Sequence, residues 1–262
     1  MLRSLWTAAS GMLAQQQNVD VISNNLANVN TTGYKTMRAE FSDLLYQTIK
    51  DPGASTGEGI TSPVGIQLGH GTKLTATYRV FTVGNMQATE RPLDIAIEGD
   101  GFFQVQQLDG TTAYTRDGSF KVNADGQVVT SDGLLLEPPI SLPDNVEQIA
   151  VGQDGTVSVV VTGESTPQDV GQITLSKFIN PAGLRAIGHN LYTASPASGD
   201  PVIVDPGSEG SGILSQGYLE MSNVSVVDEM VKMITAQRAY EINSKAIQTS
   251  DDMLSLANNL KR

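Results

Sequence analysis

The fold is decided by the last stretch of the chain, Val224–Leu260, which reads VSVVDEMVKMITAQRAYEINSKAIQTSDDMLSLANNL. It contains neither proline nor glycine, the two residues that most strongly disfavour a helix. An apolar or aromatic residue recurs at every seventh position, at Val226, Met233, Tyr240, Ile247 and Leu254. Because seven residues span almost two helical turns, these side chains lie in one stripe. The stretch therefore predicts one long amphipathic helix within residues 222–262.

The same spacing recurs at the other end of the chain. One line of seven-residue steps there comprises Leu5, Met12, Val19 and Leu26, and a second comprises Ala8, Gln15, Ile22 and Val29. A seven-residue apolar period over three or more repeats is typical of coiled-coil packing. We therefore expect a second long helix within residues 1–33, packed with the first as a coiled-coil-like pair.

Two interpretations of these stripes remain open. They could be buried within one monomer, or they could pack between copies of the chain. In the second case the assembly interface is predicted to comprise Leu5, Met12, Val19, Ile22, Leu26, Val29, Val226, Met233, Tyr240, Ile247 and Leu254.

A cluster of turn-forming residues separates the first helix from residues 34–73. Asn28, Asn30 and Gly33 tolerate left-handed backbone conformations, so they are predicted to form a hinge or turn. Apolar residues at helical spacing then predict a connecting helix over Tyr34–Ile49. The Gly-, Ser-, Thr- and Pro-rich stretch that follows, up to Gly71, is expected to be a surface loop or extended arm.

The middle of the chain, residues 74–221, has the pattern of an all-β domain. Short apolar or alternating runs are separated by six Asp-Gly pairs, at Asp100-Gly101, Asp109-Gly110, Asp117-Gly118, Asp125-Gly126, Asp132-Gly133 and Asp154-Gly155. Asp-Gly between such runs is a strong hairpin signal. We therefore predict an α+β fold with an all-β domain inserted between the two terminal helices.

Composition limits the classes of partner. The chain of 262 residues has a formal net charge of -12 and no cysteine, and residues 51–221 contain seven basic and twenty acidic side chains. Such a surface repels nucleic acid and anionic lipid and attracts basic partners. No run of eighteen apolar residues predicts insertion in a membrane, and Met1–Gln17 lacks the pattern of a secretory signal peptide.

No arrangement of residues predicts catalysis, metal binding or a cofactor. His70 and His189 have no cysteine, histidine or carboxylate at ligand spacing. Asn123, Asp125 and Gly126 are similar to the start of a calcium loop, but the acidic residue that should close it is missing. We therefore expect a non-enzymatic protein.

Four motifs carry a resemblance to a known family. They are ISNNLANVNTTGYK at 22–35, GDGFF at 99–103, YTRDGSF at 114–120 and QRAYEINSK at 237–245. The chain resembles the bacterial flagellar rod and hook axial proteins over nearly its whole length. The motif positions are Gly33, Tyr34, Lys35, Gly101, Phe102, Phe103, Tyr114, Arg116, Gly118, Arg238, Tyr240 and Asn243. Glu40–Ile49 and Pro52–Gly69 look like the extra arm of the distal-rod members.

The resemblance implies a structural subunit of the flagellar distal rod. Such a subunit polymerises into a straight hollow helical tube, with its terminal helices in the inner layer, and transmits torque to the hook. The resemblance also implies contacts with proximal-rod and hook subunits and with the P and L ring proteins. It implies export through the flagellar type III apparatus without a cleaved signal peptide, and a place in the periplasm-spanning basal body.

The residues themselves suggest how such a subunit would assemble. Apolar stripes exposed in a free monomer predict terminal segments that fold when the subunit docks. The Pro52–Gly69 arm is expected to brace neighbouring subunits. Two alternatives stay open, a proximal-rod or hook paralogue, and a secreted oligomeric enzyme or carbohydrate-binding module on a helical stalk.

Overall fold

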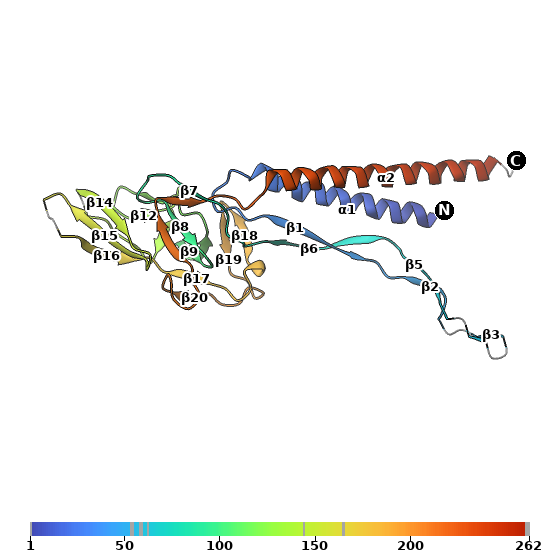
Figure 1. The fold of residues 1–262 in the computed structure, drawn as a ribbon, viewed down its shortest axis with the longest axis horizontal. Helices are drawn as coiled ribbons and strands as arrows, with labels where there is room; N and C mark the ends of the chain where they lie inside the picture. Colours follow the sequence, from blue (N-terminus) through green and yellow to red (C-terminus); the bar gives the residue numbers. More distant parts are fainter. Residues whose placement is uncertain are drawn as a thin grey trace. The chain divides into compact units, whose positions relative to one another are not determined.

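The fold is α+β, with one long helix near each end of the chain and strands between them (Figure 1). The computed structural model describes residues 2–52, 55–57, 60–61, 63–143, 145–163 and 166–259. The chain divides into two compact units. The helical unit comprises Met1–Leu26, Met37–Tyr78 and Val226–Arg262, and the β unit comprises Ala27–Thr36 and Arg79–Ser225.

Two helices form most of the helical unit, as their apolar spacing predicted. Helix α1 spans Leu2–Ala27 and helix α2 spans Val226–Asn259. They lie side by side with opposite chain directions (Figure 1). Asp228 and Glu229 lie in the first turn of α2, where a negative charge favours the helix N-terminus.

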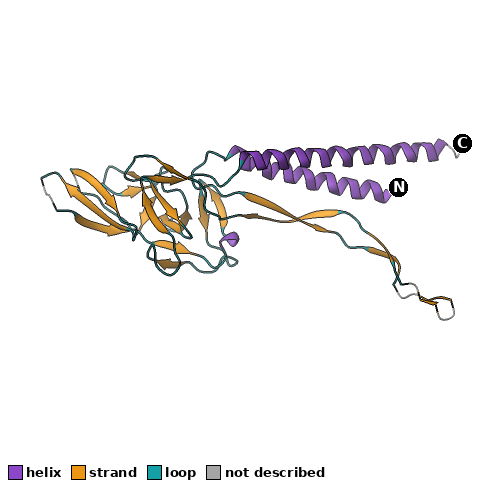
Figure 2. Ribbon diagram, viewed as in Figure 1, coloured by secondary structure: helices purple, strands orange, loops and turns teal. Residues whose placement is uncertain are grey.

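The rest of the helical unit is a two-stranded arm, visible as paired strands in Figure 2. Strand β1 pairs with β6, β2 with β5, and β3 with β4. The strand bounds are β1 Met37–Asp43, β2 Gln47–Lys50, β3 Ser55–Gly57, β4 Ile60–Thr61, β5 Ile66–Leu68 and β6 Thr72–Arg79. Part of the predicted arm, at 53–54, 58–59 and 62, lies outside the described residues.

The connecting helix predicted over Tyr34–Ile49 is wrong, because the chain there forms strands β1 and β2. Two non-local interactions explain the difference. The backbone of β1 (Met37–Asp43) pairs with that of β6 (Thr72–Arg79), which lies beyond the rest of the arm in the sequence. The side chain of Asn25 also bonds both the N–H and the C=O of Met37. Apolar spacing over a short segment cannot distinguish a helix from a strand that is held by such distant partners.

The β unit consists of short strands. Their bounds are β7 Met86–Ala88, β8 Ile95–Glu98, β9 Phe102–Gln106, β10 Thr112–Thr115, β11 Lys121–Val122, β12 Val128–Val129, β13 Leu135–Glu137, β14 Val146–Val151, β15 Thr156–Val161, β16 Gln168–Gln172, β17 Leu175–Lys177, β18 Arg185–Gly188, β19 Leu191–Thr193, β20 Val202–Val204, β21 Ile213–Gln216 and β22 Tyr218–Glu220. A short 3-10 turn spans Pro181–Gly183.

The main sheet of the β unit has nine described strands, in the order β11-β12-β13-β9-β10-β19-β18, with β17 pairing both β9 and β20. Strands β14, β15 and β16 form a three-stranded sheet, and β21 pairs with β8 and β22 with β7. One buried apolar cluster joins the main and three-stranded sheets, including Phe103 and Leu175 of the first and Val159 of the second. A second cluster is aromatic and contains Phe102 and Tyr192.

Four of the six Asp-Gly pairs are hairpin turns, as predicted. They connect β9 to β10, β11 to β12, β12 to β13, and β14 to β15. The hairpin prediction is wrong at Asp100-Gly101, because β8 pairs with β21 instead of β9. It is also wrong at Asp117-Gly118, where a β-carbon on Gly118 would lie 1.7 Å from the carbonyl oxygen of Ile95. Glycine there permits close packing of two backbones.

Candidate functional site

Helices α1 and α2 meet along a polar seam. The Ser4 and Ser250 hydroxyl oxygens lie 3.1 Å apart, and Asn25 Nδ2 donates to Glu229 Oε2 over 3.1 Å. Between these pairs, a β-carbon on Gly11 would lie 2.8 Å from Asn243 Nδ2, so glycine makes room for the asparagine. Each contact lies a multiple of seven residues further along α1 and the same number earlier along α2. The seven-residue period of both helices is therefore also present in polar and small residues.

The predicted apolar stripes flank this seam instead of forming it. Ile22 is buried with 2% of its surface exposed, whereas Val226 and Tyr240 are 40% and 44% exposed. The other eight predicted interface residues are partly buried, namely Leu5, Met12, Val19, Leu26, Val29, Met233, Ile247 and Leu254. Their role in assembly stays a prediction.

A further set of apolar side chains faces away from the seam on each helix. In α1 these are Trp6 and Leu13, and in α2 they are Val227, Met230, Val231 and Ile234, all more than half exposed. A helical turn of 3.6 residues places five of them roughly half a turn away from Ser4, Gly11 and Glu229, and Met230 roughly a quarter of a turn away from Glu229. We call these six side chains the outer apolar face. Large apolar side chains that remain exposed together mark an interaction surface.

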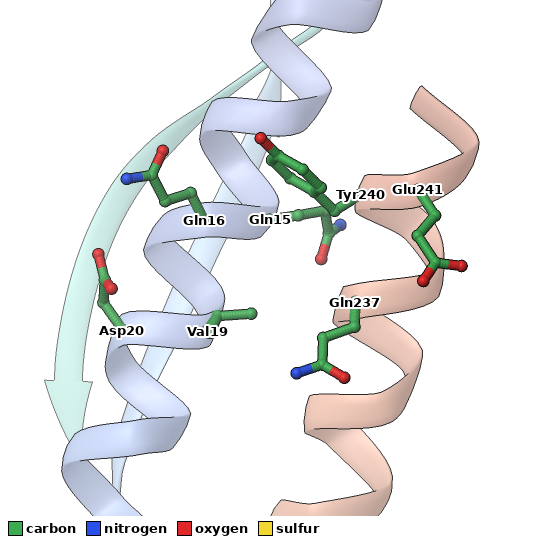
Figure 3. Close-up of a pocket in the computed structure, with 7 residues that line it drawn as sticks. All are labelled: Gln15, Gln16, Val19, Asp20, Gln237, Tyr240 and Glu241. Atoms are coloured by element: carbon green, nitrogen blue, oxygen red, sulfur yellow. The ribbon is translucent and has the colours of Figure 1, made fainter. Parts of the chain in front are cut away.

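A groove between the helices is lined mainly by amide and acidic side chains (Figure 3). Helix α1 contributes Gln15, Gln16, Val19 and Asp20, and α2 contributes Gln237, Tyr240 and Glu241. The ring of Tyr240 reaches from α2 toward Gln15 (Figure 3). Glu241 accepts a hydrogen bond from Arg238, with a nitrogen–oxygen distance of 2.8 Å. Tyr240 and Arg238, two of the motif positions, therefore lie at or beside this groove.

In the β unit, two motif segments and the backbone at Gly84 converge on the buried carboxylate of Glu220. Lys35 Nζ lies 2.5 Å from Oε1, and Arg116 Nη1 lies 3.3 Å from Oε2. The backbone N–H of Gly84 also donates to Oε1 over 2.8 Å. All three charged side chains are about 1% exposed. A buried carboxylate with these donors compensates two cations that would otherwise be costly to bury.

A second residue binds the same passages of the chain. Asn223 Oδ1 accepts from the N–H of Thr36 over 2.7 Å, and Asn223 Nδ2 donates to the carbonyl oxygens of Val80 and Thr82. Residues 33–36, 80–84 and 220–223 are therefore bonded to one another. These segments lie beside three of the points where the chain passes between the units, into β1 after Thr36, out of β6 before Arg79 and into α2 after Ser225.

The remaining motif positions in the β unit surround this cluster. Gly33 has a φ of +66°, and a β-carbon on it would lie 2.8 Å from the backbone of Arg116 and Asp117. The guanidinium of Arg116 lies over the ring of Phe102, 5.4 Å from its centre. The other motif aromatics, Tyr34, Phe103 and Tyr114, are buried. The turn predicted at Asn28 and Asn30 is present, with Thr31 N–H bonded to the carbonyl of Asn28.

Sequence reasoning missed the polar partners that complete these contacts. The sequence did not predict the contacts of Asn25, Glu220, Asn223 or Glu229. The seven-residue series from Ser4 to Asn25 and from Glu229 to Ser250 was a signal that could have identified the seam.

Lys35 makes the stability of the β unit depend on pH. Burial and the repulsion of Arg116 lower the pKa of Lys35 from 10.5 to about 8, although Glu220 opposes this shift. Between these values the unfolded chain binds more protons than the folded one, so the free energy of unfolding rises with pH. We expect a chemical-denaturation series from pH 7.5 to 9.5 to give a steeper rise for the natural chain than for Lys35→Met. Equal slopes would contradict this assignment.

Within the described part of the chain, no group of three or more His, Cys, Asp or Glu side chains is placed to hold a metal ion. None of the described helices combines the length and the apolar character needed to cross a membrane.

Comparison with known proteins identifies relatives over the whole length. Three family profiles match: "Flagella basal body rod protein" at 5–35, "Flagellar hook protein FlgE/F/G D1 domain" at 96–159 and "Flagellar basal body rod FlgEFG protein C-terminal" at 215–260. The chain is 57% identical to the "Flagellar basal-body rod protein FlgG" of Borreliella burgdorferi, over 100% of both chains. Proteins of the same name are 49% identical in Caulobacter vibrioides, over 99% of this chain and 100% of the relative, and 43% identical in Bacillus subtilis, over 100% of both.

Proposed function

The chain belongs to the family of flagellar basal-body rod proteins, and from this membership we propose that it is a structural subunit of the distal rod. It polymerises through its terminal helices into a straight hollow tube that transmits torque to the hook. In the assembled tube the seven-residue periodicity continues as coiled-coil-like packing. The observation that carries this proposal is the outer apolar face, which has no covering element within the described helical unit.

The outer apolar face is large enough to drive association. Removing six such side chains from water contributes roughly 1.5–3 kcal/mol each, or on the order of 10 kcal/mol in gross terms. Ordering the terminal segments opposes part of that gain. The fully buried apolar side chains of the described parts of α1 and α2 are Ala8, Ala14, Ile22 and Ala236, mostly small, so the helix pair itself supplies a smaller term. We therefore expect the helical unit to be ordered mainly by contact with neighbouring copies.

The direct test compares the monomer with the concentrated protein. We expect limited proteolysis of the dilute monomer to remove both terminal segments and leave a resistant β unit. Circular dichroism should show less helix than α1 and α2 contain. After concentration, electron microscopy should show straight hollow filaments. A monomer with protected helices that never polymerises would instead favour the enzyme or binding module on a helical stalk.

The arm supplies a second contact between copies. Large apolar side chains are exposed along its described strands and turns, at Leu45, Tyr46, Ile49, Val64, Ile66 and Leu68. A two-stranded ribbon with this surface is stabilised when another element covers it. We propose that the arm braces neighbouring subunits and stiffens the tube.

Shortening the arm tests this role. In a variant with residues 45–70 replaced by an Asn-Gly turn, the turn joins Leu44 to Gly71, whose backbones are already hydrogen-bonded, so β1 and β6 keep their pairing. We expect filaments that bend more, measured as a shorter persistence length in electron micrographs. Filaments as straight as those of the natural chain would contradict the bracing role.

The surface charge supports the remaining proposed contacts. Residues 51–221 contain seven basic and twenty acidic side chains, so we propose that the β unit turns inside the P and L rings against a basic lumen. Screening by salt should change that fit, and a fit independent of salt would contradict it. We further propose contacts with proximal-rod and hook subunits, export through the type III apparatus without a cleaved signal peptide, and a location spanning the periplasm.

A further inference from the structure

We infer that Asn25 is a positioning residue for assembly, whose one side-chain amide fixes both the register of α1 against α2 and the point where the arm leaves the helix pair. This inference rests on the proposed function, because it concerns the helical unit through which the chain polymerises. Asn25 is 1% exposed and lies in the seam.

The side-chain amide of Asn25 makes the same two hydrogen bonds to the backbone of Met37 that a paired β-strand would make. Its Oδ1 accepts from the N–H of Met37 over 2.9 Å, and its Nδ2 donates to the C=O of Met37 over 2.8 Å. The same Nδ2 donates over 3.1 Å to Oε2 of Glu229 in α2. An amide nitrogen has two hydrogens, so it can serve both acceptors. Three elements, α1, β1 and α2, therefore meet on one buried group.

Glu229 makes this arrangement specific. Its side chain is 3% exposed, and Lys232 Nζ lies 2.6 Å from its other oxygen, Oε1. A shift of α1 by one turn would leave the carboxylate without the Asn25 donor and the backbone of Met37 without its partner. Buried polar groups that lose a partner are costly, so the pair favours one register. The outer apolar faces of the two helices are then presented in one fixed relation.

The isosteric substitution Asn25→Asp tests the donor specifically. The introduced carboxyl can still accept from the N–H of Met37. When ionised it can donate neither to the C=O of Met37 nor to Glu229, and it repels the Glu229 carboxylate. Asn25 lines a pocket of the helical unit, and the charged groups that face it there are Glu229 and Lys232 from α2 and Arg38 from β1. Helix α1 contributes no charged residue to the described lining of that pocket. Burial and Glu229 favour the protonated carboxyl, whose single O–H can replace one of the two hydrogen bonds that the asparagine amide donates.

Assembly of Asn25→Asp should therefore depend on pH. At pH 8 we expect its critical concentration for filaments to rise about tenfold or more over the natural chain, and at pH 5 to approach that of the natural chain. Glu229→Gln in the same chain supplies an amide donor to the ionised carboxyl, so the double variant should assemble at both pH values. Gln17→Glu, the same change at an exposed position of α1, is the matched control.

A cross-link in the same samples separates this inference from the proposed function. Ser4→Cys with Ser250→Cys places the only two thiols in the chain at a seam contact of 3.1 Å. We expect oxidation at pH 8 to join them in the natural background and to join far fewer in Asn25→Asp. If the natural background cross-links but forms no filaments, the proposed function fails while the role of Asn25 is still measured. Filaments and cross-links that are unchanged in Asn25→Asp, or a loss equal at both pH values, would overturn the inference.

Discussion

Replacing Glu220 by alanine is expected to destabilise the β unit by about 3–5 kcal/mol, the cost of leaving a buried ion pair with one partner removed. Lys35 and Arg116 both lose their counter-charge, although their distances of 2.7 Å to the carbonyl oxygens of Thr82 and Gly99 remain. Arg116 Nε already has no hydrogen-bond partner among the described residues, so loss of Glu220 would leave a second nitrogen of the buried guanidinium without its carboxylate partner. The backbone N–H of Gly84 also loses its acceptor.

Calorimetry of the full chain below its polymerisation concentration measures this effect as a lower melting temperature of the β unit. Glu98→Ala is a matched control, because Glu98 is an exposed carboxylate at the end of β8 and should change stability by less than about 0.5 kcal/mol. Triple replacement by methionine at Lys35, Arg116 and Glu220 should recover much of the loss, since it removes both buried cations. Equal melting temperatures for Glu220→Ala and Glu98→Ala would show that the cluster contributes nothing to the fold.

The sequence predicted the elements whose signals are local. The two long helices followed from seven-residue apolar spacing, and four hairpins followed from Asp-Gly pairs between apolar runs. Both patterns arise from backbone preferences within a few residues, which do not depend on distant partners. The α+β class and the β-rich middle followed from the same signals.

The failures all involve partners far apart in the chain. Strand β1 has the apolar spacing of a helix, but β6 and the amide of Asn25 hold it extended. Glutamate is usually found on the protein surface, so the sequence gives no sign that Glu220 is buried. Only the fold places it between Lys35 and Arg116. The polar seam was not predicted from the sequence, because serine, glycine and asparagine usually indicate helix caps and turns. Here they let two helices approach closely.

These observations assign different tasks to different faces of the same helices. The polar seam contains small side chains and directional hydrogen bonds, which select a register but contribute little burial of apolar area. The outer apolar face contributes burial only when another molecule covers it. Separating the two tasks allows the pairing of α1 with α2 to be specific while leaving the driving force for association to contacts between copies.

Adding charge to the outer apolar face should therefore stop polymerisation without changing the fold of the monomer. The variant carries Val227→Asp, Val231→Asp and Ile234→Asp, at positions that are 71%, 56% and 55% exposed. At about 1.5 kcal/mol for each lost side chain, the critical concentration should rise by roughly 1,000-fold, and burying three carboxylates would raise it further. The melting temperature of the β unit should stay within the error of the measurement.

A control with Val227→Ile, Val231→Ile and Ile234→Val keeps the surface apolar and should form filaments near the concentration required by the natural chain. Sedimentation and electron microscopy of both variants over a dilution series measure the two critical concentrations. If the aspartate variant polymerised as readily as this control, the outer face would not be an interface. The half-buried stripes beside the seam would then be the surface that drives assembly, and the same substitutions at Tyr240 and Ile247 would identify them.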